Sequence, residues 1–131
     1  MDIVHESNVS GVKVHDRKLQ WIVSGNSDIS SDYFSSCIVE FQPGATAKPP
    51  HSHSDCEEAI FILSGSGELL VEGGTSHPIR EGSFIVARKD EIHMLRNTGS
   101  NMMKAICFFT FPTDNTKYDF HPIESVGMKD D

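Results

Sequence analysis

The chain has 131 residues, with 11 Lys or Arg against 19 Asp or Glu, so its formal net charge is -8 at pH 7. This acidic balance argues against binding to nucleic acid or to an anionic membrane surface, because both depend on clustered cations that neutralise phosphates. The length predicts one domain spanning residues 1–131, large enough to bury a core.

The sequence carries no recognisable targeting segment. Residues Met1–Glu6 lack the basic stretch and the following apolar stretch of a secretory signal. No apolar run approaches the ~18 residues that a membrane-spanning helix requires. Cys37, Cys56 and Cys107 are an odd number of cysteines without a CxxC pair, which favours a reducing compartment over a disulfide framework. We therefore expect a cytoplasmic protein.

Short apolar runs, alternating or continuous, are broken every eight to twelve residues by turn sequences, which is typical of an all-β sandwich or barrel. Helical periodicity is nearly absent. In chain order, the expected strands are Gly11–Val14, Gln20–Val23, Tyr33–Phe41, Glu58–Leu63, Gly67–Val71, Thr75–Ile79, Ser83–Ala87, His93–Asn97 and Met102–Phe109.

Glycine and proline indicate how two of the intervening segments run. Gly73 and Gly74 tolerate the positive φ values of a tight turn, so Val71–Thr75 is the clearest predicted hairpin. Pro49 and Pro50 cannot donate to a strand ladder, so the residues after them should start from a rigid extended segment at a strand start or edge. The polar tail, residues 112–131, is expected to be a short cap or a partly disordered end.

The segment that follows these prolines carries most of the chemistry in the chain. His51 and His53 are two residues apart, so on an extended strand both imidazoles leave the same face and can grip one ion. Glu58 lies five residues beyond His53, an odd offset that requires a bend, and Ser54–Cys56 suits one. His93 supplies a third imidazole. A lone histidine pair is also compatible with a solvent-exposed surface, and Glu57 competes with Glu58 for the carboxylate role.

Two spaced motifs strengthen the interpretation as a metal site. The first runs Gly44, six residues, His51-x-His53, four residues, Glu58, six residues, Gly65. The second runs Gly82, five residues, Arg88-x-Asp90, two residues, His93, three residues, Asn97. Together they resemble the motifs of the cupin superfamily, G-x5-HxH-x3,4-E-x6-G and G-x5-PxG-x2-H-x3-N. The departures are one extra residue before His51, Arg88 in place of Pro and Asp90 in place of Gly. None of them falls on a ligand position, and Asp tolerates positive φ.

The resemblance implies a double-stranded β-helix, that is, a jelly-roll barrel similar to the small single-domain cupins of the RmlC-like type, with motif 1 at 44–65 and motif 2 at 82–97. It implies that one divalent metal ion is bound by His51, His53, Glu58 and His93. Glu58 is preferred to Glu57 because it leaves six residues to Gly65 and shares a face with apolar Ile60 and Ile62. Three imidazoles and a carboxylate suit Fe, Mn, Ni, Zn or Cu. Cys56, in the bend, is a further candidate ligand or a small loop residue that points elsewhere.

The resemblance leaves two classes of function. The first is a metal-dependent enzyme (isomerase, lyase or dioxygenase) acting on a small polar or acidic organic molecule. The second is a non-catalytic module that binds or senses a sugar-like or acidic ligand. In either case the partner is a small molecule, and the side chains expected to contact it are Tyr33, Lys48, Arg88 and Arg96. Small cupins are frequently homodimers, and residues 9–23 are the expected interface, because an unpaired barrel edge favours association.

Overall fold

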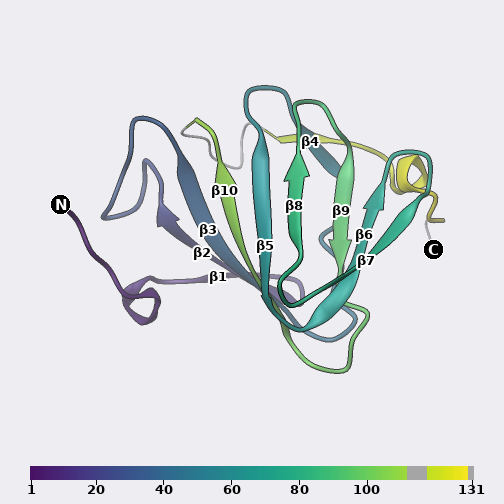
Figure 1. Cartoon of the computed structure of the whole chain (residues 1–131), viewed down its shortest axis with the longest axis horizontal. Coiled ribbons are helices and arrows are strands. Elements are labelled where there is room, and N and C mark those ends of the chain that lie inside the picture. Colours follow the sequence, from purple (N-terminus) through teal and green to yellow (C-terminus); the bar gives the residue numbers. More distant parts are fainter. Residues whose placement is uncertain (112–117, 130–131) are drawn as a thin grey trace.

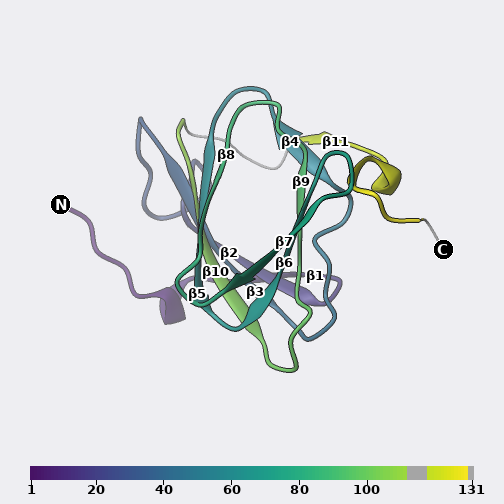
Figure 2. The same cartoon turned by 45° about the vertical axis from the view of Figure 1, so that its right-hand side comes forward.

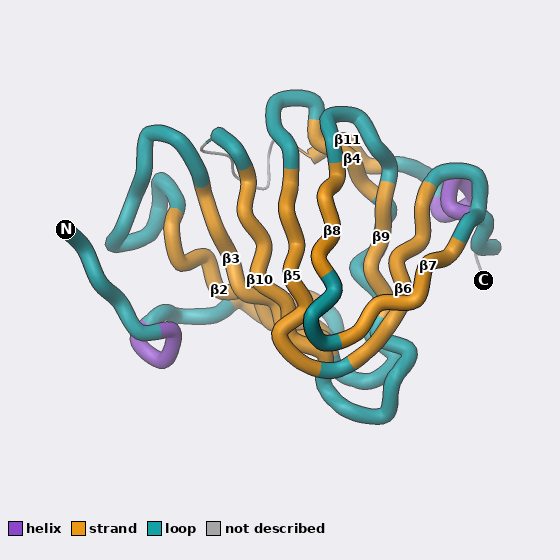
Figure 3. Tube along the Cα trace, in the orientation of Figure 1, coloured by secondary structure: helices purple, strands orange, loops and turns teal. Residues whose placement is uncertain are grey.

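The structure is a computed structural model that describes residues 1–111 and 118–129, and it is built from two antiparallel sheets (Figures 1 and 3). The six-stranded sheet has the order β1 (Val12–Val14), β2 (Arg17–Val23), β3 (Ser35–Phe41), β10 (Met103–Phe109), β5 (Glu58–Ser64) and β8 (Phe84–Ala87). The five-stranded sheet has the order β11 (Tyr118–Phe120), β4 (His51–His53), β9 (His93–Arg96), β6 (Ser66–Val71) and β7 (Ser76–Arg80).

Helix is confined to two 3-10 turns, η1 (Glu6–Asn8) and η3 (Ile123–Val126), in the described part of the chain. In the same residues, no helix has the length and apolar character needed to cross a membrane. The expected all-β, double-stranded β-helix architecture is therefore confirmed, with the two sheets facing each other around a common interior (Figure 2).

Each of the predicted strands overlaps an observed one, with ends shifted by a few residues. The pattern did not predict β4 and β11 as separate strands. Each has three residues, and neither contains the β-branched residues that indicate a strand in the equally short β1. β11 lies in the segment expected to be a cap or disordered end; residues 112–117 and 130–131 of that segment lie outside the described residues.

The core fills the space between the sheets, because alternate residues of every long strand point inward. On β5 the inward residues Glu58, Ile60 and Ile62 are 4%, 1% and 0% exposed, while Leu63 is 38% exposed. A smaller apolar cluster of Leu70, Met94 and Val126 lies where η3 packs against the five-stranded sheet. The main cluster consists of Cys37, Val39, Phe41, Ala45, Ala47, Cys56, Ile60, Ile62, Ile79, Ile85, Leu95, Met103, Ala105, Cys107 and Phe109.

The turn residues of the two motifs adopt the conformations that their sequence predicts. Gly44, Gly65 and Gly82 have φ of 83°, 84° and 91°, and Asp90, where the cupin pattern has Gly, has φ of 67°. The Asp90 amide donates to the His53 carbonyl at 2.8 Å, which ties the second motif to β4. Asn97 is buried, and its Nδ2 donates to the carbonyl oxygens of Phe41 and Asn101, both at 2.9 Å.

Gly65 and Gly44 provide a matched pair for testing the turn between β5 and β6. Both have positive φ, but a Cβ on Gly65 would lie 2.7 Å from the Met102 carbonyl oxygen and from the Met103 Cα, whereas a Cβ on Gly44 meets nothing within 4 Å. Gly44→Ala should therefore cost only the positive φ, about 1 kcal/mol, and Gly65→Ala about 3 kcal/mol because the backbone must also move. Urea unfolding of both variants measures the difference, and equal losses would contradict this account.

Candidate metal centre

The four expected ligands meet at one point although they come from both sheets. The donor atoms of His51, His53, Glu58 and His93 all lie within 4.8 Å of one another. His51 and His93 are register partners of β4 and β9 in the five-stranded sheet, whereas Glu58 begins β5 in the six-stranded sheet. The bend predicted between His53 and Glu58 is therefore the crossing from one sheet to the other.

Backbone pairing decides that Glu58 rather than Glu57 points inward. The Glu57 amide donates to Thr110 Oγ1 and the Thr110 amide donates to the Glu57 carbonyl, both at 3.0 Å, just beyond the Glu58↔Phe109 pair. Alternation then places Glu58 in the interior, 4% exposed, and leaves Glu57 exposed. The preference for Glu58 over Glu57 agrees with this arrangement.

One oxygen of Glu58 is shared by two imidazoles. Oε1 lies 3.1 Å from His53 Nε2 and 3.0 Å from His93 Nε2. Burial by itself raises the pKa of the Glu58 carboxyl, but the hydrogen bonds from His53 and His93 outweigh it and hold that pKa below its ordinary value. The group is therefore a carboxylate, which is the form that binds a cation.

Hydrogen bonds to the backbone orient two of the three histidine rings. His93 Nδ1 donates to the Glu91 carbonyl at 2.9 Å, which fixes the ring with Nε2 directed into the site. The His51 ring is hydrogen-bonded to the Pro49 backbone. Among the described residues His53 Nδ1 is buried with no hydrogen-bond partner, so its Nε2 is the ring nitrogen engaged in the site.

The donor set fits a divalent ion. Ligands ~2.1 Å from a metal and at right angles to each other lie roughly 3.0 Å apart, and the two Glu58–imidazole distances are 3.0 and 3.1 Å. A carboxylate oxygen and an imidazole lone pair repel each other at such distances. The arrangement is favourable only when a proton or a cation lies between them. Neutral imidazoles and one carboxylate are the chemistry of Fe, Mn, Ni, Zn or Cu sites.

Tyr118 of β11 is part of the site and was not among the expected residues. Its ring stacks on His51 with centroids 4.9 Å apart and an interplanar angle of 14°, and it meets His53 edge-on at 4.4 Å. Burial raises the pKa of the Tyr118 hydroxyl, so the group stays neutral. The only local sign was the pair Tyr118-x-Phe120 in a polar tail, which does not by itself indicate pairing with β4.

The cysteines lie outside the group of four donors in the described residues. Cys56 is fully buried in the main core, and burial, reinforced by a hydrogen bond with Asp55, raises its pKa to about 12. A neutral thiol is a poor ligand, which favours its role as a small core residue. Cys37 and Cys107 are register partners on β3 and β10, also in the core.

The four side chains expected to contact a substrate are scattered. Tyr33 is 81% exposed between β2 and β3, and Arg88 is exposed after β8. Arg96 Nη2 pairs with Glu68 Oε1 at 2.7 Å. In the described residues, no hydrogen bond joins any of the four to the candidate metal ligands.

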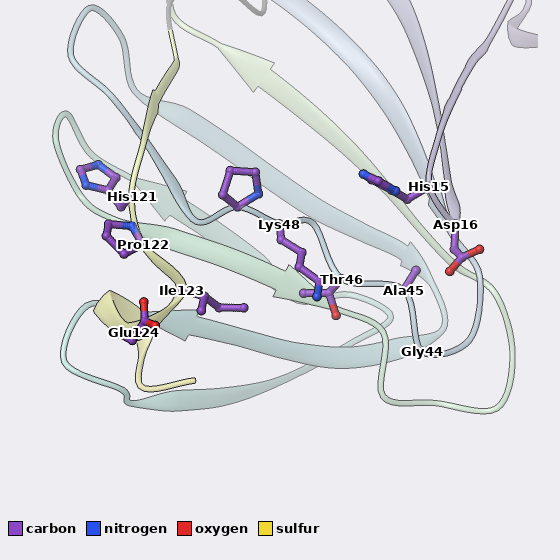
Figure 4. A pocket seen from close by; sticks show the side chains of 11 residues that line it. His15, Asp16, Gly44, Ala45, Thr46, Lys48, His121, Pro122, Ile123 and Glu124 are labelled. Carbon is purple, nitrogen blue, oxygen red and sulfur yellow. The ribbon is translucent and has the colours of Figure 1, made fainter. Parts of the chain in front are cut away.

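Lys48, the fourth of these residues, faces a different hollow from the ligand cluster. This hollow, about 840 Å³ in volume, is lined by residues 44–46, 48–49 and 121–124 together with His15 and Asp16 (Figure 4). The ligand histidines and Glu58 are not among its lining residues. A substrate role for Tyr33, Lys48, Arg88 or Arg96 stays a prediction.

Protonation of His51 should affect the stability of the metal-free protein. Burial, then the neighbouring His93, lowers the pKa of His51 to about 3, from ~6.5 in an unfolded chain. The unfolded state thus binds a proton at His51 more readily than the folded state does. The free energy of unfolding therefore falls as the pH drops below about 6.5 towards the folded-state pKa. Between pH 6.5 and 4.5, in EDTA, wild type should lose about 2 kcal/mol more unfolding free energy than His51→Gln.

Urea unfolding at several pH values measures this difference. His77→Gln, which alters an exposed histidine of β7, is the matched control and should parallel the wild type. Identical pH dependence of the unfolding free energy in His51→Gln and wild type would contradict the lowered pKa of His51.

Comparison with curated proteins finds partial matches to L-ectoine synthases. The sequence from Vibrio cholerae serotype O1 is 35% identical over 69 residues, which are 53% of this chain and 48% of that protein. The sequence from Vibrio campbellii is 36% identical over 55 residues, 42% of this chain and 43% of that protein. The chain thus spans about half the length of the curated relatives it matches.

Solved structures share the fold over most of the chain. The polyketide cyclase RemF from Streptomyces resistomycificus has a TM-score of 0.72 at 19% identity, covering 95% of this chain and 91% of its own. Ectoine synthase from P. lautus has a TM-score of 0.71 at 20% identity, covering 88% and 82%. Oxalate decarboxylase from Lactobacillus farciminis has a TM-score of 0.75 at 20% identity, covering 88% and 34%.

A protein-family model described as "Cupin domain" matches residues 37–109, more than half of the chain and the whole of the segment that contains the four donors. With the two-sheet barrel and the expected turn conformations of both motifs, this match shows that the chain belongs to the cupin domain family.

Proposed function

We propose that this cupin binds one divalent metal ion through His51, His53, Glu58 and His93 and is an enzyme acting on a small polar or acidic organic molecule. The observation that carries the proposal is the convergence of four donor atoms within 4.8 Å. When bound, the ion would supply Lewis acidity and a template for substrate oxygens. An isomerase, a lyase and a dioxygenase are the reaction classes that such chemistry serves.

The surroundings of the donors suit catalysis. Inward-facing Ile60, Ile62 and Leu95 are at most 6% exposed and line the interior beside Glu58 and His93. An apolar wall excludes water and strengthens the interaction between charges inside the barrel. Four protein ligands on a six-coordinate ion would leave two positions for a substrate.

The comparisons support an enzyme rather than a binding module. The partial relatives are named L-ectoine synthase, and the structural neighbours include a polyketide cyclase and an oxalate decarboxylase. Each name is that of an enzyme acting on a small organic compound. We place the protein in the reducing cytoplasm, where the free and buried cysteines Cys37, Cys56 and Cys107 would stay reduced.

Glu58→Gln, with Glu57→Gln as the control, tests the proposal. The amide keeps the shape of Glu58 but removes the charge, so metal affinity should fall by about 100-fold and metal-dependent turnover should be lost. Glu57 is exposed, and its variant should behave as wild type. Metal-free protein would be reconstituted with Fe, Mn, Ni, Zn or Cu. Elemental analysis and chelator competition measure metal binding, and turnover is measured with 2-hydroxy and 2-oxo carboxylates as substrates.

Two results would count against the proposal in different ways. Wild-type protein that retains none of the five ions in stoichiometric amount would remove the metal site. Protein that binds metal and carboxylate tightly but forms no product detectable by mass spectrometry would support the non-catalytic binding module.

Tyr118 should contribute to metal affinity by holding the His51 and His53 rings. Tyr118→Leu removes the stacked ring and should weaken binding by about 10-fold, whereas Tyr118→Phe keeps the ring and should bind metal nearly as the wild type does. Phe120→Leu on the same strand, 59% exposed in the wild type, is the control. Chelator competition measures all three variants, and an unchanged affinity in Tyr118→Leu would contradict a positioning role.

A further inference from the structure

Arg17 is a half-buried cation on the inner side of the barrel wall. It begins β2, and Leu19 and Trp21, which alternate with it on the same side of the strand, pack against the main core. The hollow of Figure 4 is lined by His15 and Asp16, which immediately precede it, but Arg17 is not one of its lining residues. The guanidinium therefore belongs to the interior rather than to that hollow.

No protein group compensates the charge of Arg17. Within residues 1–111 and 118–129, its guanidinium takes part in none of the ion pairs, and Nε is buried without a hydrogen-bond acceptor. Arg96, by contrast, pairs with Glu68. Burial lowers the pKa of the Arg17 guanidinium, which nevertheless stays protonated. A buried charged donor without an acceptor is costly, so an anion that supplies the acceptor would bind favourably.

The Tyr118 hydroxyl is a second donor at the same place. β2 lies next to the outermost strand of the six-stranded sheet, and β11 is the edge strand of the five-stranded sheet. Tyr118 is close enough to act electrostatically on the Arg17 guanidinium, so these two edges approach each other on one side of the barrel. Burial raises the pKa of the hydroxyl, which keeps its proton, and in the described part of the chain it has no hydrogen-bond acceptor.

The Tyr118 ring connects this pair of donors to the candidate metal centre. The ring contacts His51 and His53, and Phe109, whose centroid is 6.3 Å from that of Tyr118, also meets His53 edge-on at 5.3 Å. One end of the Tyr118 side chain therefore lies against two candidate ligands, and its hydroxyl end lies near Arg17. A small molecule bound to an ion at the four donors could place a second polar group beside Arg17.

We propose that Arg17 and the Tyr118 hydroxyl bind a carboxylate of the substrate, and that the substrate is an acid whose metal-binding group lies several bonds from this carboxylate. The inference rests on the proposed metal-dependent function and narrows its substrate from polar or acidic molecules to acids with two separated polar ends. The planar fork of a guanidinium matches a carboxylate, and a small turn of the Arg17 side chain would give Nε the acceptor that it lacks.

The charges of the interior favour a substrate with two negative charges. With a divalent ion bound and the three histidines neutral, Glu58 neutralises only one of the three positive charges that the ion and Arg17 bring. A dianionic acid would balance the other two. An uncharged substrate would leave the guanidinium unpaired in a site from which it displaces water, which is unfavourable.

Calorimetric titration with matched acids tests the proposal. The protein is loaded with Zn²⁺, or with another of the five ions if that is the one retained. 2-Hydroxyadipate and 2-hydroxyhexanoate offer the metal the same 2-hydroxy acid group, but only the first has a distal carboxylate. 2-Hydroxyglutarate and 2-hydroxypentanoate repeat the comparison with a shorter chain. Wild type should bind the diacid of at least one pair about 30-fold more tightly, as expected for hydrogen bonds to a charged group.

Variants assign this preference to individual groups. Arg17→Met should reduce it to below about 3-fold, and Arg17→Lys should retain part of it, because the charge remains but the fork is lost. Tyr118→Phe should reduce it by about 5-fold through loss of one hydrogen bond. Lys18→Met, which removes a neighbouring cation from the opposite side of β2, is the matched control and should keep the wild-type preference.

Two further measurements separate substrate binding from a structural role of Arg17. Chelator competition should give an unchanged metal affinity for Arg17→Met. Its urea midpoint should be no lower than that of wild type, because the substitution removes a cation that has no protein partner.

The possible failures are distinct. A wild type that binds metal but prefers neither diacid would overturn this inference and leave the metal site standing. An Arg17→Met variant that keeps the full preference, or one that loses urea stability and metal affinity together with it, would also overturn it. Wild type that retains none of the five ions would overturn the proposed function, and this inference with it.

Discussion

The contact of the Glu58 carboxylate with His53 and His93 is the constraint on which the rest of the structure depends. A carboxylate that is only 4% exposed costs several kcal/mol to bury unless partners compensate it. Its two imidazole partners come from the opposite sheet, so the compensation exists only when both sheets have closed around the interior. The buried Glu58 carboxylate is therefore stabilised only when the fold brings β4, β5 and β9 together.

Several local features serve this convergence. The hydrogen bond from the Asp90 amide to the His53 carbonyl and the pairing of Glu57 with Thr110 hold the chain on either side of the bend. Asn97 ties the end of the second motif to the Phe41 carbonyl on the six-stranded sheet. None of these contacts involves the donor atoms themselves, yet the pairing of Glu57 with Thr110 decides which carboxylate faces the histidines.

Alternation gives the two sides of the six-stranded sheet different surroundings. Its inner residues contribute Glu58 and an apolar wall to the candidate metal centre, and its outer residues hold η1 and expose Phe84 and Phe108. Since alternate side chains point to opposite sides, changes on one face leave the other largely unaffected. The hollow that contains Lys48 is a third surface, formed by the loop after β3 and the residues after β11.

The sequence by itself determined the fold class, the long strands and the four donors. Strands of four to seven residues between clear turn signals can be read locally, and the spacing of His51, His53, Glu58 and His93 is a property of the linear chain. The choice of Glu58 over Glu57 also follows from counting residues to Gly65 and from strand parity. Asp90 in place of glycine has a positive φ, as its residue type allows.

Only the tertiary structure placed Tyr118 against His51 and His53 and paired β11 with β4. More than sixty residues separate these partners, and neither β4 nor β11 contains the β-branched residues that indicate a strand, so the local sequence predicts neither the strands nor their pairing. The scattering of Tyr33, Lys48, Arg88 and Arg96 has the same cause, because the environment of a long polar side chain depends on which strands lie beside it. Sequence spacing thus determined which groups can bind a metal, and the pairing of distant strands decided what surrounds them.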